Sequence, residues 1–429
     1  MGRTFEKVVL GCAVLLVASN AAADDLSLQS VVKLALTRNE RAEIADESVI
    51  SADAAVTKAR VAFLPTVTLS ANETLRPQEV DSNGRVALRS NAASAALTVS
   101  QSLLNAGAFP LYSAAKHSYD AARFSHDDTR RQLAFDAARS FFSVVAQQRL
   151  LKAANSRRDL ALATLKDTQV RASSGLVSSN DVTRSEIESA SADQSTINAG
   201  NSLQAARFNL EYLIAAPIEI DADLAAPTQT LAPTNQSLAG LVNLAIATRP
   251  DLAALRASAA SASALAEEPG LRFVPTLSAQ AQARTQDQAI VNDRYIDTTL
   301  TLNFNWQIWD GGSRSADSTS RNAAHRAAEL QLRSLARRVE TDVRVAIAEL
   351  TAARAALVAA EQGQDAARRS EEETSVLYKQ GLAKAIELVS GNSSKFDAEV
   401  AVAAAELNVR QAELDLRAAL GLFPLDGFQ

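Results

Sequence analysis

The sequence contains an internal duplication, and this feature restricts the fold more than any other. Three short motifs of the first half return in the second half at a constant spacing of about 210 residues: Ser27-Leu28 as Ser237-Leu238, Leu34-Ala35 as Leu244-Ala245, and Phe63-Leu64-Pro65-Thr66 as Phe273-Val274-Pro275-Thr276. Later motifs repeat at a slightly shorter spacing, about 205 for Gly107 and Gly312 and about 206 for Gly175 and Gly381. A repeat of this kind predicts two similar structural halves, and the change of spacing places a loop of variable length between the Pro-Thr and Gly motifs.

The first residues predict a secretory signal peptide. A charged start at Met1–Lys7 precedes an apolar run at Val8–Ala18 and the small residues Ala21-Ala22-Ala23. This order is typical of a cleaved signal over residues 1–23, and the apolar run is too short to span a bilayer. The only cysteine, Cys12, lies inside the run rather than after it, which argues against a lipoprotein signal and leaves the mature chain without disulfides.

Composition and charge exclude several classes of function. The net charge is −6 with both signs interspersed, so there is no basic face for nucleic acid. The three histidines, His117, His126 and His325, lack metal-ligand spacing. No nucleophile, base or metal-binding set is clustered in the sequence. We therefore predict that the protein is not an enzyme and requires no cofactor or metal.

Two segments in each half alternate apolar and polar residues, which predicts strands. The segments are 63–72, 95–100, 277–284 and 299–308. In the last one, Leu300, Leu302 and Phe304 alternate with polar residues, and Trp306 and Trp309 lie near one end. The alternation and length suit tilted transmembrane strands with an aromatic girdle at the interface. A soluble antiparallel sheet with one wet face would produce the same alternation.

The number of predicted strands has a consequence for assembly. Four strands are fewer than the smallest membrane barrels use, so insertion requires several chains to share one barrel. Two, three or four copies would give eight, twelve or sixteen strands. The polar segments Arg76–Asn91 and Gln286–Asp297 are predicted as exposed loops, and Asn105-Ala106-Gly107 and Asp310-Gly311-Gly312 as turns leaving the barrel rather than phosphate-binding loops.

Two long segments predict unusually long helices. Gly107–Ser174 and Gly312–Gln380 contain almost no Pro or Gly. A continuous helix of this length approaches about 100 Å. Val343, Leu350 and Leu357 recur at heptad spacing, as in a coiled coil. Each long helix leads to a Gly-Leu tip and a returning helix, so each repeat is expected to hold a helix, two strands and a long helical hairpin.

The duplicated motifs, taken in order, resemble the TolC-like outer membrane efflux protein family. The resemblance covers nearly the whole mature chain and includes the Pro-Thr strand starts, the strand ends at 100–104 and 306–310, and the Gly-Leu tips. It implies a mostly α protein with a membrane β-barrel, in which a homotrimer forms a twelve-stranded barrel in the cell outer membrane and an α-barrel in the periplasm. The implied parts are a signal peptide at 1–23, a first repeat at 24–215, an equatorial linker at 216–236, a second repeat at 237–420 and an equatorial tail at 421–429.

The resemblance implies a passive exit duct of a tripartite efflux pump or a type I secretion system. Such ducts dock through their hairpin tips onto a periplasmic adaptor driven by an inner membrane pump or secretion ATPase. The implied docking residues are Gly175, Leu176, Val177, Gly381, Leu382 and Ala383. The alternative is a periplasmic coiled-coil adaptor or scaffold, which would need neither alternating strands nor a twofold repeat. The sequence does not indicate the cargo.

The resemblance also implies a gate at the periplasmic mouth, altered from the family pattern. Asp181 and Tyr378 match family gate residues, whereas Ala383 replaces the family arginine with Lys384 beside it, and Glu387 and Ser390 replace two constriction aspartates. The implied gate and constriction residues are therefore Asp181, Tyr378, Lys384, Glu387 and Ser390. Near a threefold axis Glu387 would form a carboxylate ring that favours cations. The alternative is that Glu387 is a solvated helix residue and Asp181 a helix cap.

Overall fold

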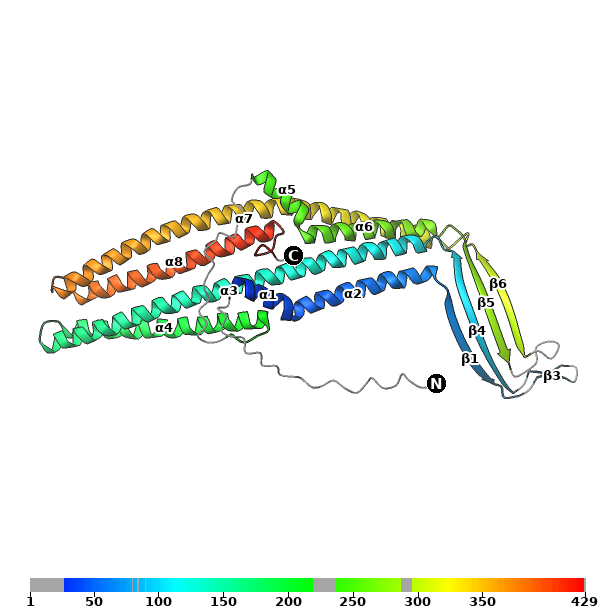
Figure 1. The fold of residues 1–429 in the computed structure, drawn as a ribbon, viewed down its shortest axis with the longest axis horizontal. Helices are drawn as coiled ribbons and strands as arrows, with labels where there is room; N and C mark the ends of the chain where they lie inside the picture. Colours follow the sequence, from blue (N-terminus) through cyan, green and yellow to red (C-terminus); the bar gives the residue numbers. More distant parts are fainter. Residues whose placement is uncertain are drawn as a thin grey trace.

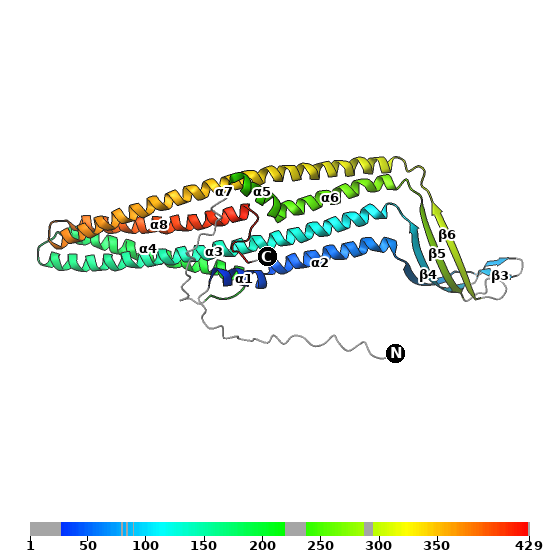
Figure 2. The same cartoon turned by 45° about the horizontal axis from the view of Figure 1, so that its top comes forward.

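The computed structural model describes residues 27–78, 80–82, 85–88, 90–218, 237–286 and 295–427. The predicted signal peptide and residues 219–236 of the predicted linker lie outside these residues. The molecule is elongated, with a β-sheet at one end and the tips of two long helical hairpins at the other (Figures 1 and 2). The predicted barrel strands and the predicted hairpin tips thus lie at opposite ends of the molecule.

Each repeat begins with two helices rather than the single helix predicted. They are α1 (Leu28–Arg38) and α2 (Glu40–Arg60) in the first repeat, and α5 (Leu238–Thr248) and α6 (Pro250–Leu271) in the second. The breaks fall at Asn39 and Arg249, both with extended backbone. Asn39 caps α2 by accepting from the Arg41 N–H, and Pro250 disfavours helical geometry at Arg249. Within the described residues no single helix is long and apolar enough to cross a bilayer; α5 and α6, bent by 53°, meet that criterion only as a pair.

The four predicted strands form one antiparallel sheet, which confirms the alternation signal. The strands are β1 (Thr66–Leu75), β4 (Asn91–Leu104), β5 (Thr276–Gln286) and β6 (Ile296–Asn305), in the order β1-β4-β5-β6. No described helix covers either face (Figures 1 and 2), and apolar residues stay exposed, with Val67 at 66% and Leu300 at 77%. Such a sheet requires a lipid or protein partner to cover its apolar face.

Three details of the sheet differ from the sequence prediction. β1 begins at Thr66 rather than at Phe63, because Val61–Phe63 form a short 3-10 helix. β6 ends at Asn305, so Trp306 and Ile308 lie beyond the strand that was expected to continue to residue 308. The segment 76–91, predicted as a loop, contains the short hairpin of β2 (Val80–Ser82) and β3 (Arg85–Leu88). Residues 287–294 of the second predicted loop lie outside the described residues.

The long helices are confirmed and are continuous. They are α3 (Ala108–Ser173, 66 residues) and α7 (Ser313–Lys379, 67 residues), returned by α4 (Ser179–Ile214) and α8 (Ala385–Ala419). At 1.5 Å per residue, α3 and α7 are each about 100 Å long. β1 and β5 begin 210 residues apart, whereas α3 and α7 begin 205 apart. The repeat spacing therefore changes between the start of the first strand and the start of the long helix, a segment that contains the loop joining the two strands of each repeat.

The apolar core lies where the helices of one repeat meet the other, midway along the molecule. Phe141 of α3 and Leu210 of α4 are fully buried in a cluster that joins α1, α3, α4 and α8. A second cluster joins α5, α7 and α8 around Val343 and Leu350 of the predicted heptad. Phe423 and Leu425 of the C-terminal tail pack against the first cluster. The tail thus lies at the middle of the molecule.

Candidate functional site

The tips of both hairpins have the same backbone geometry. Gly175 and Gly381 follow α3 and α7 with φ of +72° and +78°. The Leu176 N–H donates to the Arg171 carbonyl, and the Leu382 N–H to the Leu377 carbonyl, each at 2.9 Å. These bonds, with those of the glycine N–H groups, form Schellman motifs, which require left-handed backbone where glycine is favoured.

The Schellman motifs present two leucines to solvent. Leu176 is 74% exposed and Leu382 is 73% exposed. Val177 and Ala383 are half-buried beside them. The residue at this position usually packs back on its helix, so two leucines held outward form an apolar surface at the tips.

The two return helices begin differently although they occupy equivalent positions. In α4, Ser178 and Asp181 form a capping box, in which the Asp181 N–H donates to the Ser178 hydroxyl at 3.3 Å and the Ser178 N–H to the Asp181 carboxylate at 3.2 Å. In α8 the cap position is occupied by Lys384, whose side chain has no acceptor atom. Asp181 is therefore engaged in its own protomer, and the cap itself is Ser178.

Glu387 is the equivalent of Asp181 in the second repeat and lacks the capping partner. It is exposed and makes no side-chain hydrogen bond or ion pair to the described residues. Lys384 and Ser390 are also exposed on the same end of α8. The Glu387 carboxylate therefore faces solvent at the start of α8.

Tyr378 lies between the two hairpins rather than beside Asp181. Its side chain is 5% exposed, and its hydroxyl is 3.4 Å from the Thr168 hydroxyl of α3. The Arg171 guanidinium lies over its ring at 4.7 Å. Burial raises the pKa of the Tyr378 hydroxyl, and the nearby Asp167 carboxylate adds to the rise. Within one protomer Tyr378 therefore joins α7 to α3.

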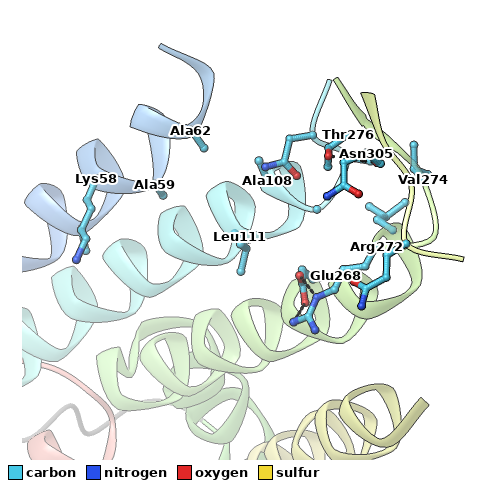
Figure 3. Close-up of a pocket in the computed structure, with 16 residues that line it drawn as sticks. Lys58, Ala59, Ala62, Ala108, Leu111, Glu268, Arg272, Val274, Thr276 and Asn305 are labelled. Atoms are coloured by element: carbon cyan, nitrogen blue, oxygen red, sulfur yellow. Dashed lines mark hydrogen bonds and ion pairs between the residues drawn. The ribbon is translucent and has the colours of Figure 1, made fainter. Parts of the chain in front are cut away.

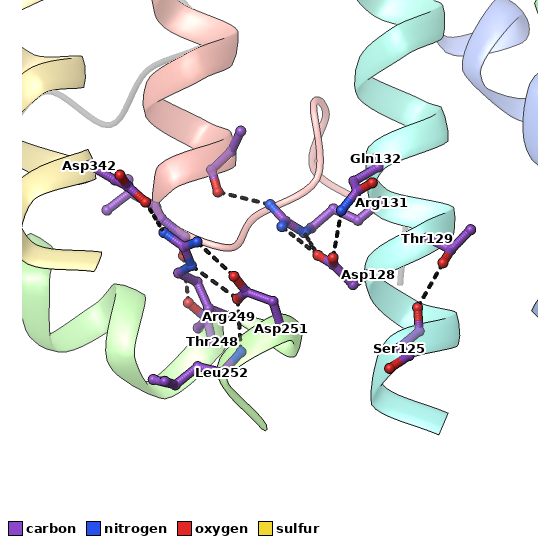
Figure 4. A network of polar contacts seen from close by, with 12 residues as sticks. Ser125, Asp128, Thr129, Arg131, Gln132, Thr248, Arg249, Asp251, Leu252 and Asp342 are labelled. Carbon is purple, nitrogen blue, oxygen red and sulfur yellow. Dashed lines mark hydrogen bonds and ion pairs between the residues drawn. The ribbon is translucent and has the colours of Figure 1, made fainter. Parts of the chain in front are cut away.

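A polar network at the middle of the molecule was not found from the sequence (Figure 4). Arg249, at the break between α5 and α6, pairs with Asp251 at 2.7 Å and with Asp342 of α7 at 3.0 Å. The Thr248 hydroxyl donates to the Leu420 carbonyl, which ties the same break to the end of α8. Burial opposes ionisation of Asp251, but the bonds and charge of Arg249 hold the pKa of its carboxyl below the usual value. The network fixes the α5–α6 bend to α7 and α8.

A second feature missed from the sequence is a cavity of about 620 Å³ where the sheet meets the helices (Figure 3). Asn105, Thr276 and Asn305 line it together with Glu268. Glu268 is 5% exposed and binds Arg272 at 2.6 Å. The same carboxylate also pairs with Arg321 at 3.0 Å, so Glu268 joins α6 to α7. Among the described residues, no group of three or more His, Cys, Asp or Glu side chains is arranged to hold a metal.

Comparison with known proteins agrees with this geometry. The sequence profile described as "Outer membrane efflux protein" matches residues 31–216 and 241–422. No curated protein matches the chain at a significant level.

Several solved structures share the fold at low sequence identity. The CmeC outer membrane channel of Campylobacter jejuni is 16% identical, with 92% of this chain and 85% of that chain covered and a TM-score of 0.81. The outer membrane protein VceC of Vibrio cholerae is 17% identical, with 93% and 97% covered and a TM-score of 0.78. The open state of the MtrE outer membrane channel of Neisseria gonorrhoeae is 20% identical, with 92% and 89% covered and a TM-score of 0.78.

Proposed function

The chain belongs to the outer membrane efflux protein family, and from this membership we propose that three copies form a passive exit duct. It is an outer membrane channel and not an enzyme. Channels of this family function as trimers with periplasmic adaptors. In the proposed assembly each copy supplies four strands to a twelve-stranded barrel, and α3, α4, α7 and α8 line a periplasmic α-barrel.

One observation carries the proposal for the assembly. The sheet has two edge strands, β1 and β6, each with one strand partner among the described residues, and neither face is covered by a helix. Open edges and exposed apolar side chains are stable in a bilayer only when the sheet closes into a barrel. Joining β6 of one copy to β1 of the next closes the barrel.

The proposed trimer is tested by the mass of the protein extracted from membranes in detergent. We expect the outer membrane fraction to release a particle of three mature chains, measured by native mass spectrometry. A monomeric or dimeric particle that remains folded would contradict the threefold arrangement.

We further propose roles for the two ends of the helical part. The tip residues 175–177 and 381–383 would dock onto the adaptor, because they present exposed leucines. The tail 421–427, with the linker 216–236, would form the equatorial belt between the repeats 24–215 and 237–420. Export driven by an efflux pump is favoured over type I secretion, since the matching family is one of efflux proteins.

Among the gate and constriction residues, we propose that Glu387 supplies the pore charge. Its carboxylate is unpaired in the described chain, whereas Asp181 is held by Ser178. Tyr378 would act by holding the hairpins together, and Lys384 and Ser390 would lie beside the constriction. In a trimer Glu387 would occur three times around the axis, which favours cations.

Replacing Glu387 with glutamine is expected to reduce the cation preference of the channel. A carboxylate acting on an ion at ~4 Å in water contributes about 1 kcal/mol, and each trimer would lose three carboxylates, so the cation-to-anion permeability ratio should fall by at least about fivefold. Reversal potentials in a salt gradient measure this ratio. Asp181→Asn is the matched control, because it removes the equivalent carboxylate that is already engaged in a helix cap. Equal effects of the two substitutions would remove the special role of Glu387.

A further inference from the structure

Helix α3 carries five arginines on one face, and each contacts the second hairpin. They are Arg131, Arg139, Arg149, Arg157 and Arg171. With residues 100° apart around a helix, all five fall within a sector of about 80°. Arg158, which follows Arg157, lies outside this sector, and among the described residues it pairs only with Asp159 of the same helix. We call the five residues the α3 arginine row.

The partners of the row change in kind along the molecule. Near the middle, Arg131 donates to the Ala418 carbonyl at 2.8 Å and Arg139 to the Asp415 carboxylate at 2.6 Å, while Arg149 pairs with a glutamate of α8. Toward the tip the partners are aromatic rings. The Arg157 guanidinium lies 4.9 Å from the Phe396 ring centre, and Arg171 lies 4.7 Å from that of Tyr378. A hydrogen bond to a carboxylate fixes the direction of the guanidinium N–H, whereas a guanidinium over an aromatic ring can shift parallel to the ring and keep the contact.

Arg157 is the first arginine of the row whose contact with α8 is a ring. Its guanidinium donates to Glu188 of α4 at 2.9 Å, and both side chains are nearly buried, at 10% and 12% exposure. Ser191 and Ser195 of α4 accept further bonds from it at 3.4 and 3.3 Å. The first hairpin thus holds the cation in place, and the second hairpin rests on it through Phe396.

We propose that Arg157 is a positioning residue that, through Phe396, sets the resting width of the duct between this point and the hairpin tips. Between Arg157 and the sheet, the contacts of Arg139 and Arg149 with carboxylates hold α8 to α3. Between Arg157 and the tips, ring contacts and the hydroxyl contact of Tyr378 with Thr168 hold the second hairpin to the first. No carboxylate of the second hairpin pairs with the arginine row there among the described residues, so this part of the hairpin can move away from the first. The inference rests on the proposed trimeric duct, because only in a closed assembly does hairpin separation change an aperture.

The test removes the ring and leaves the Arg157–Glu188 pair intact. Phe396→Leu keeps an apolar side chain of similar size, Phe396→Tyr keeps the ring, and Arg158→Gln is the control for an arginine outside the row. Each variant and the unmodified protein are purified as the full assembly. Single-channel conductance is recorded in a planar bilayer, and the unfolding temperature of each assembly is measured alongside.

We expect Phe396→Leu to raise the mean conductance at least about twofold through loss of the cation–π contact, with the unfolding temperature nearly unchanged. Phe396→Tyr and Arg158→Gln should conduct like the unmodified protein. The inference is overturned if the unmodified protein conducts and Phe396→Leu conducts equally, or if Phe396→Tyr behaves like Phe396→Leu. If no inserted variant conducts, the proposed duct itself fails, and the inference fails with it. Should Phe396→Leu not assemble, Phe396→Met is used with the same expected result.

Discussion

The substitution Gly421→Ala is expected to destabilise the protein severely. Gly421 has φ of +75°, and a Cβ atom placed on it would lie 2.8 Å from the backbone nitrogen and Cα of Arg249. The left-handed backbone costs an L-residue about 1–2 kcal/mol, and overpacking against another backbone about 1–3 kcal/mol more. We therefore expect a loss of about 2–5 kcal/mol in the free energy of unfolding.

Thermal unfolding of the purified protein, followed by circular dichroism, measures this loss. Gly427→Ala is the matched control, since Gly427 has φ of +95° but an added Cβ would meet nothing within 4 Å. The control should show only the smaller backbone cost. Equal unfolding temperatures for the two variants would show that the close approach to Arg249 does not matter.

The expected loss in the free energy of unfolding is large because Gly421 lies where two parts of the second repeat meet. The chain turns at Gly421 directly after α8, against the break between α5 and α6. Arg249 at that break is paired with Asp251 and Asp342. A displaced Gly421 would shift Arg249 and leave its nearly buried charge without good partners, which is costly. The packing of α8 against the α5–α6 break therefore depends on this turn.

Replacing both tip leucines, Leu176→Asp together with Leu382→Asp, is expected to abolish adaptor-dependent export. Burying one leucine contributes about 1.5–3 kcal/mol, so losing both should weaken adaptor binding by about a hundredfold or more. Both side chains point to solvent in the protomer, so folding should be unaffected. Export is measured as the cellular accumulation of a dye whose efflux the unmodified protein supports, in cells that lack the chromosomal copy and carry the variant on a plasmid.

The control for the tip variant replaces both leucines with methionine, which keeps an apolar side chain of similar size. That variant should export the same dye normally. If the aspartate variant also exports normally, with the assembly present in the outer membrane at the usual level, the tips do not carry the docking surface. If the assembly is absent, the leucines have a structural role instead.

The sequence was sufficient for the elements whose signals are local. The duplicated motifs predicted two equivalent halves, and the segments around Gly107 and Gly312 predicted helices that the structure confirms as α3 and α7. Period-two alternation located all four strands of the sheet. The helix and strand signals are local because each depends on the spacing of residues within one element, whereas the duplication is a repeat of the whole order of elements.

Other features depend on contacts between distant segments and were missed. The break at Arg249 could have been predicted from Pro250, but Asn39 has no proline after it and its break depends on capping. The arginines of the α3 row share a helix face, but their contacts with the second hairpin could be predicted only if α8 were known to lie against α3. The contact of Tyr378 with Thr168 likewise joins residues 210 positions apart. Sequence spacing alone does not specify such pairs.

Planar-bilayer recording of the detergent-purified mature protein shows whether this chain forms a conducting channel in a membrane. We expect insertion with small, long-lived openings that prefer cations, as expected for a barrel leading to an acidic constriction. Folded protein that leaves the bilayer conductance unchanged and does not float with liposomes on a density gradient would contradict it.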